Sequence, residues 1–141
     1  MPVTNYYTVN GEIIGESGNR VIAEHDPTWH GEVGAIRDAC RKLGTVNLQG
    51  CELYTSCEPC AMCVAAMHIA GIAKLYYAAS LAQSGKAFEG VTVAARHPID
   101  VEALRAEAGA TLAQRSLPAE QKMDREAVEV LSEWAATRRG S

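Results

Sequence analysis

The segment between Leu53 and Ala79 constrains the fold more than any other part of the chain. Its pattern predicts a buried strand at Leu53–Thr55, a helix that starts within CEPCAMC and ends at Ala70 before Gly71, and a second strand in AKLYYAA. A strand, a helix and a strand in this order favour a right-handed unit with parallel strands. The middle of the chain is therefore predicted to be α/β.

A second helix is predicted just before this unit, in DPTWHGEVGAIRDACRKLG. Asp26 is a good N-cap, Pro27 fits the first helical position, and Gly44 ends the helix. Glu58 is expected to cap the helix of the central unit in the same way. Apolar residues recur between the ends of the first helix with a 3.6-residue period. They are Val33, Ile36, Cys40 and Leu43.

The flanking segments predict smaller elements. Asn10-Gly11 is a strong hairpin signal, so Tyr6–Val9 and Glu12–Gly15 are expected to pair antiparallel. The glycine- and serine-containing stretch 80–90 is expected to be a loop. Further patterns predict an extended segment at 91–95, a helix at 99–108, a strand at 110–114 and an amphipathic helix at 119–137.

Composition limits the class of protein. With 141 residues, 48% of them hydrophobic, the chain can bury a core without disulfides, and we expect a single domain over residues 1–141. Five cysteines, an odd number, and the lack of a charged and apolar leader favour a cytoplasmic protein with reduced thiols. No apolar run reaches the roughly 20 residues that cross a bilayer. The net charge of −4 gives no attraction to anionic lipid or bulk nucleic acid, so a small molecule is the expected partner.

The starts of the two predicted helices hold the residue types of a metal site. His30 and Glu32 lie near the start of the first helix, and Cys60 and Cys63 lie in the first turn of the second. If these ends meet, one imidazole and two thiolates supply three zinc ligands and leave the fourth tetrahedral position open, as in catalytic zinc sites. Helix starts also lower the pKa of thiols, which favours metal binding.

The cysteines have simpler interpretations too. Cys60 and Cys63 could form a thioredoxin-like redox pair, or a closed structural zinc site with Cys57 as the fourth ligand. A redox pair has no use for the upstream His-x-Glu, and we favour Cys57 as a pocket-lining or core thiol. Cys40 and Cys51 fall on apolar faces and are expected to pack in the core.

Two motifs carry a family resemblance. His30-Gly31-Glu32 and Pro59-Cys60-Ala61-Met62-Cys63 resemble the H-x-E and P-C-x-x-C signature of the zinc-dependent cytidine deaminase superfamily. DPTWHGEV and LYTSCEPCAMC are similar to the branch of guanine deaminases and tRNA adenosine deaminases. The resemblance runs from about Glu12 to Ala79. It implies a three-layer α/β/α sandwich around a mixed sheet, here without the usual first helix, and a homodimer whose partner subunit covers the face left open.

The resemblance also implies the roles of the site residues. His30, Cys60 and Cys63 match the zinc ligands, and Glu32 matches the general acid and base. Zinc-bound hydroxide attacks an amidine carbon, while Glu32 passes protons from the water to the ring nitrogen and to the departing ammonia. The amide of Cys60 is a candidate donor toward the developing negative charge.

Three residues are expected to contact the substrate. Asn19 matches the asparagine that hydrogen-bonds the base in this branch. Gly31 and Trp29 replace the alanines of the usual motif beside the metal. Trp29 either stacks on a base or fills the core, and the sequence leaves both open.

Three functions are compatible with these residues. The favoured one is a hydrolytic deaminase of a free nucleobase or related amino-heterocycle, guanine-like because TSCEPC resembles guanine deaminases. The second is a tRNA adenosine-to-inosine deaminase, which should carry a basic rim, although only Arg37, Arg41 and Lys42 cluster locally. The third is a non-catalytic zinc-stabilised binding module, against which the presence of Glu32 argues.

Overall fold

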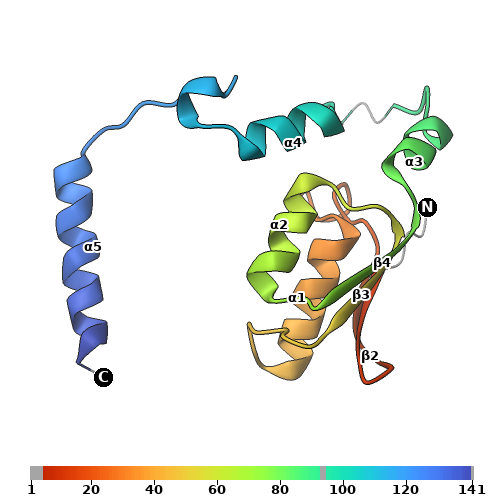
Figure 1. Ribbon diagram of the computed structural model, residues 1–141, viewed down its shortest axis with the longest axis horizontal. Coiled ribbons are helices and arrows are strands. Elements are labelled where there is room, and N and C mark those ends of the chain that lie inside the picture. The colour runs from red at the N-terminus through yellow and green to blue at the C-terminus, as the bar shows by residue number, and fades with distance from the viewer. Residues whose placement is uncertain (1–4, 93–94, 141) are drawn as a thin grey trace. The chain divides into compact units, whose positions relative to one another are not determined.

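The computed structural model describes residues 5–92 and 95–140. The chain divides into two compact units, Met1–Ala108 and Gly109–Ser141. The described strands all lie in the first unit, and helix α4 (Val101–Gly109) reaches the boundary (Figure 1). The second unit contains a 3-10 helix (Leu112–Gln114) and helix α5 (Asp124–Arg139). None of the described helices is both long and apolar enough to cross a bilayer.

The four strands of the described residues form one mixed sheet in the order β2-β1-β3-β4. Strand β1 (Asn5–Val9) pairs antiparallel with β2 (Glu12–Ser17) on one side and with β3 (Glu52–Cys57) on the other. Strand β3 pairs parallel with β4 (Lys74–Ala79). Asn10 and Gly11 both have positive φ angles, 51° and 78°, which the tight turn between β1 and β2 requires. The predicted hairpin, the parallel pair and the α/β class with a mixed sheet are confirmed.

Helices α1 (Gly31–Leu43) and α2 (Ala61–Ala70) lie side by side on one face of this sheet (Figure 1). Gly44 and Gly71 end them in the left-handed conformation, as predicted. The core fills the space between these two helices and the sheet. Its buried members are Ala35, Ala39, Leu48, Cys51, Leu53, Met67 and Ala70, and Cys40 packs against them, so both cysteines take the predicted packing role.

The two helices begin later than their acidic residues predict. The N-cap of α1 is His30, not Asp26, because Asp26 Oδ1 accepts hydrogen bonds from the Thr28 backbone N–H (2.8 Å) and hydroxyl (2.6 Å) and closes a turn upstream. The N-cap of α2 is Cys60, not Glu58. The carboxylate of Glu58 instead lies 3.9 Å from the guanidinium of Arg105.

The segments after β4 depart further from prediction. The expected loop at 80–90 contains helix α3 (Leu81–Ala87), which a capping box between Ser80 and Gln83 stabilises. The strand expected at 110–114 is wrong, since a 3-10 helix occupies its second half. Of the extended segment expected at 91–95, residues 93 and 94 lie outside the described residues and the rest has no strand. Helices α4 and α5 confirm the two helices expected near 99–108 and 119–137.

Candidate metal centre

The topology brings the starts of α1 and α2 to one edge of the sheet. Strands β2 and β3 both run antiparallel to β1, so they point the same way and end at the same edge. Helix α1 follows β2 and helix α2 follows β3, so both helices begin there. This places His30, the N-cap of α1, near Cys60, the N-cap of α2, and near Cys63 in the first turn of α2.

The three side chains have the spacing of tetrahedral zinc ligands. The Nδ1 atom of His30 lies 3.6 Å from both sulfurs, and the sulfurs of Cys60 and Cys63 lie 3.8 Å apart. Zinc bonds of about 2.3 Å to sulfur and about 2.0–2.1 Å to nitrogen, at tetrahedral angles, require separations of roughly 3.6 Å and 3.8 Å. The donor set therefore fits zinc and leaves one coordination position for water or substrate.

The two thiols differ strongly in acidity. The hydrogen bond with Cys63, followed by that with His30, lowers the pKa of Cys60 to about 4. The hydrogen bond with Cys60, followed by burial, raises the pKa of the Cys63 thiol. These opposite directions favour negative charge on Cys60, which lies at a helix start where backbone N–H groups stabilise a thiolate.

Glu32 lies beside these ligands in the first turn of α1. Its residue is only 8% exposed, and burial raises the pKa of its carboxyl group above the usual range. Hydrogen bonds to its own backbone N–H and to Cys63 oppose this shift. A buried carboxyl group with a raised pKa can hold or release a proton closer to neutral pH, as a general acid and base must.

Of the other predicted site residues, Asn19 and Trp29 lie on the segment that leads into α1, and Gly31 begins the helix. Asn19 is exposed, and its Oδ1 accepts a hydrogen bond from the Val21 N–H at 3.1 Å. Gly31 is buried as the first residue of α1, and Trp29 is partly buried. Cys57 ends β3, and the group of three potential metal ligands found among the described residues does not include it.

Sequence patterns did not indicate Arg96. One of its guanidinium nitrogens lies 2.9 Å from His30 Nε2, the imidazole nitrogen opposite the two sulfurs. A guanidinium group only donates hydrogen bonds, so His30 Nε2 is the acceptor. Arg96 lies outside any helix or strand, where no periodicity or motif could have connected it with residue 30.

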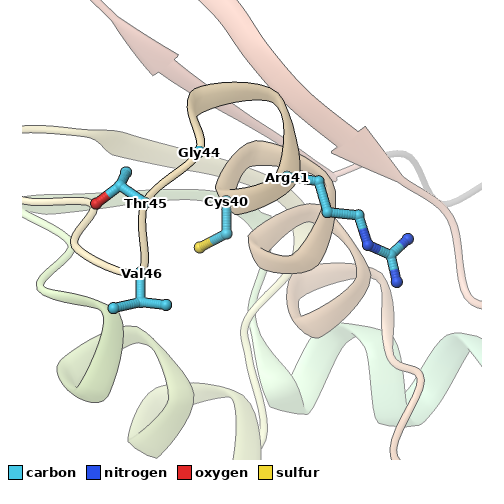
Figure 2. Close-up of a pocket in the computed structure, with 5 residues that line it drawn as sticks. All are labelled: Cys40, Arg41, Gly44, Thr45 and Val46. Carbon is cyan, nitrogen blue, oxygen red and sulfur yellow. The ribbon is translucent and has the colours of Figure 1, made fainter.

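A separate hollow lies at the far end of α1. Figure 2 shows its lining residues, Cys40, Arg41, Gly44, Thr45 and Val46. Helix α1 has 13 residues and is therefore about 20 Å long. This hollow is thus about one helix length from His30 and plays no part in the metal centre.

The chain is similar in sequence and structure to known deaminases. Guanine deaminase from Bacillus subtilis (strain 168) is 47% identical over 78 residues, which cover 55% of this chain and 50% of that protein. A tRNA-specific adenosine deaminase from Agrobacterium fabrum is 41% identical over 91 residues, covering 64% and 60%. The X-ray structure of the Bacillus subtilis guanine deaminase matches with a TM-score of 0.80 at 33% identity, covering 95% of this chain and 79% of that one.

The chain spans about half the length of the curated relatives it matches. The family model described as "Cytidine and deoxycytidylate deaminase zinc-binding region" matches residues 2–79, a range that includes the three ligands and Glu32. Because this range is more than half of the 141 residues, the chain belongs to the cytidine and deoxycytidylate deaminase zinc-binding family.

Proposed function

We propose that the chain is a zinc-dependent hydrolytic deaminase of a free nucleobase or related amino-heterocycle, with guanine favoured. The observation that carries this proposal is the buried carboxyl group of Glu32 beside His30, Cys60 and Cys63. A purely structural zinc site has no use for such a group, because burying a carboxyl without a ligand role costs free energy. The same observation argues against a non-catalytic binding module.

Each residue of the proposed site has its own role in deamination. His30, Cys60 and Cys63 would hold zinc, which would supply the Lewis acidity that makes water a nucleophile near neutral pH. Glu32 takes a proton from the attacking water and delivers protons to the ring nitrogen and then to the leaving amine. A carbon–oxygen bond forms, the carbon–nitrogen bond breaks, and ammonia leaves. Asn19 hydrogen-bonds the polar edge of the base and orients it.

Similarity and charge favour a small substrate over RNA. The Bacillus subtilis guanine deaminase is 47% identical to this chain, against 41% for the Agrobacterium fabrum tRNA-specific adenosine deaminase, and its X-ray structure covers 95% of this chain. The local basic cluster is also mostly neutralised, because Arg37 pairs with Asp26 at 3.3 Å and Lys42 pairs with Asp38 at 2.8 Å.

Adenosine deamination in tRNA is the second candidate, supported by the 41% identity to the Agrobacterium fabrum enzyme. Binding of a tRNA anticodon hairpin would weaken steeply with salt, whereas guanine turnover would change little. The single domain over residues 1–141, the homodimer and the cytoplasmic location expected from the sequence stay predictions.

Ammonia release tests the proposal. We expect zinc-loaded protein to release ammonia from one member of a panel of free aminopurines, aminopyrimidines, triazines, nucleosides and a tRNA anticodon hairpin. Glu32→Gln should retain zinc but lose turnover by about 10²–10⁴-fold or more, because general acid–base catalysis is removed. The matched control is Glu12→Gln, at an exposed position of β2, which should keep wild-type turnover.

Each outcome assigns a function. Release from guanine, lost in Glu32→Gln, supports the favoured substrate. Release from the hairpin alone moves the protein to RNA editing. Wild-type turnover in Glu32→Gln would refute the proton-transfer role, and zinc binding without release from any compound would favour the binding module.

A further inference from the structure

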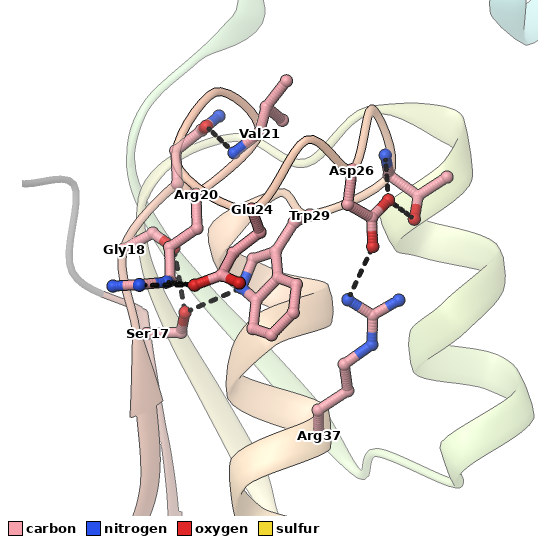
Figure 3. Close-up of polar contacts among 10 residues, drawn as sticks. Ser17, Gly18, Arg20, Val21, Glu24, Asp26, Trp29 and Arg37 are labelled. Carbon is pink, nitrogen blue, oxygen red and sulfur yellow. Dashed lines mark hydrogen bonds and ion pairs between the residues drawn. The ribbon is translucent and has the colours of Figure 1, made fainter.

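The indole of Trp29 is held from several sides. Its Nε1 donates to the Ser17 hydroxyl of β2 at 3.4 Å, and that hydroxyl donates to the Gly18 carbonyl at 2.9 Å. The guanidinium of Arg37 lies over the ring, 4.7 Å from its centre. Figure 3 shows the indole between these two partners. With Arg37 over one face of the ring, that face is not available to stack on a base.

Gly34 makes room for this arrangement. A Cβ atom at position 34 would lie 2.5 Å from Trp29 Nε1 and 2.3 Å from Ser17 Oγ. Both distances are far below van der Waals contact, so only glycine lets the indole and the hydroxyl meet against α1. The Trp29 ring therefore packs between β2 and α1, in space that a side chain at position 34 would fill.

Arg37 is itself fixed from a second side. Its guanidinium lies 3.3 Å from Asp26 Oδ2, and the other oxygen of Asp26 accepts the two hydrogen bonds from Thr28 (Figure 3). Asp26, Thr28 and Trp29 all belong to the segment between β2 and α1. Arg37 thus joins the α1 surface to this segment through one ion pair and one ring contact.

The same segment carries two residues of the proposed site. It begins near Asn19 and ends at His30, and the Arg20 N–H donates to the Trp29 carbonyl at 3.1 Å. This backbone bond joins the residue after Asn19 to the residue before His30. The residue that carries the clamped ring is therefore bonded directly to the Asn19 end of the segment and adjoins His30.

We propose that Trp29, clamped by Ser17, Gly34 and Arg37, is a positioning residue that sets the placement of Asn19 relative to His30 and does not stack on the substrate. The role in substrate placement rests on the proposed function. Guanine recognition should then depend on Arg37, a residue that is not among the three potential metal ligands. Loss of the clamp should lower the affinity for the substrate and leave the rate of the chemical step unchanged.

Fluorescence tests the clamp without any substrate. The chain has two tryptophans, so Trp134→Phe leaves Trp29 as the only indole emitter. In that background, Arg37→Met should increase acrylamide quenching of Trp29, because the ring loses its cationic cover. Arg41→Met is the matched control, one turn further along α1, and should leave the quenching unchanged. Equal quenching in the two variants would overturn the proposal.

Guanine kinetics test the consequence. Trp29→Ala and Arg37→Met should each raise the KM for guanine up to about tenfold, the cost of weakening one hydrogen bond from Asn19 to the base, while kcat and zinc content stay near wild type. Trp29→Phe keeps a ring over Arg37 and should restore most of the loss, which also covers the case that the alanine variant fails to fold. An unchanged KM in Arg37→Met would overturn positioning, and quenching of Trp29 emission by guanine itself would assign the ring to base stacking. If wild-type protein does not deaminate guanine, the proposed function fails, and the quenching comparison still decides the clamp.

Discussion

Asp26 shows how a single carboxylate can link stability to pH. Hydrogen bonds from Thr28, and then the charge of Arg37, lower the pKa of Asp26 below its ordinary value of 3.8. The folded state therefore favours the ionised form. Its stabilising contribution is present above pH 3.8 and is lost as the pH falls through the lower folded pKa.

We therefore expect Asp26→Asn to melt below wild type at pH 7, with the difference disappearing as the pH approaches about 2. Thermal unfolding of both proteins across this range, with a chelator present so that zinc loss does not contribute, measures the effect. A constant difference at every pH would show that the shape of the side chain, and not its charge, matters at this position.

Arg96 is expected to oppose zinc binding. A neutral imidazole has one donor and one acceptor nitrogen, so the hydrogen bond that Arg96 donates to His30 Nε2 keeps the proton on Nδ1. Nδ1 is the nitrogen that faces the two sulfurs and must offer its lone pair to the metal. The positive charge of Arg96 acts in the same direction.

Arg96→Met should therefore bind zinc more tightly, by about tenfold, the lower end of the effects that residues around a metal ligand have. Competition with a chromophoric chelator measures the affinity. Arg105→Met, which removes a guanidinium that pairs with Glu58 and Glu102 instead, is the comparison variant. Weaker zinc binding in Arg96→Met would mean that Arg96 orients His30 for the metal.

At the scale of elements, the contact between β2 and α1 depends on two small residues. A Cβ atom on Gly15 would lie 2.6 Å from the Ala39 backbone nitrogen and 2.7 Å from the Ala39 Cβ. Backbone atoms of a helix cannot move aside cheaply. Gly15→Ala should therefore lower the free energy of unfolding by about 1–3 kcal/mol.

A substitution at Gly85 is the control, because it should change the free energy of unfolding in the opposite direction. It lies within α3 with open space around its Cα, so Gly85→Ala should stabilise the protein by about 0.5–1 kcal/mol through helix propensity. Urea unfolding of both variants measures the two changes. A neutral Gly15→Ala would show that α1 can move away from the sheet.

This close contact also explains why the apolar periodicity predicted helix α1 correctly but identified only part of its buried face. The period of large apolar residues predicted a face of Val33, Ile36, Cys40 and Leu43. The structure buries Ala35 and Ala39 completely and leaves Leu43 46% exposed, while Ile36 and Cys40 pack at the margin of the core. A pattern of large side chains cannot show that a strand approaches so closely that only alanine fits.

Local signals differed in what they could predict. The sequence predicted that His30, Cys60 and Cys63 would meet as a group of potential metal ligands, because the two helix starts that hold them are marked in the sequence. The capping box at Ser80 and Gln83 was present in the sequence, but nearby glycine and serine favoured a loop. Arg96 had no local signal at all, since only the folded chain brings it to His30.

At the scale of the whole molecule, the metal centre joins two parts of the core that are distant in sequence. His30 belongs to the β2–α1 half of the helical layer, and Cys60 and Cys63 belong to the β3–α2 half. The sheet brings these halves together through β1, which pairs with both β2 and β3. A bound zinc ion would add a direct connection between the two helix starts.

Zinc should therefore stabilise the whole first unit, because a metal that binds only the folded state shifts the folding equilibrium. At free zinc about 100 times its dissociation constant the gain is about 2.7 kcal/mol. Removing zinc with a chelator should then lower the melting temperature by roughly 10 °C, since each kcal/mol corresponds to about 4 °C for a domain of around 100 residues. Calorimetry with and without chelator measures the shift.

Two histidine variants control this measurement. His30→Ala removes one potential ligand, so its melting temperature should no longer respond to chelator. His25→Ala, at an exposed loop position, should respond like wild type. If chelator leaves the melting temperature of zinc-loaded wild-type protein unchanged, the two helix starts are held together by core packing alone.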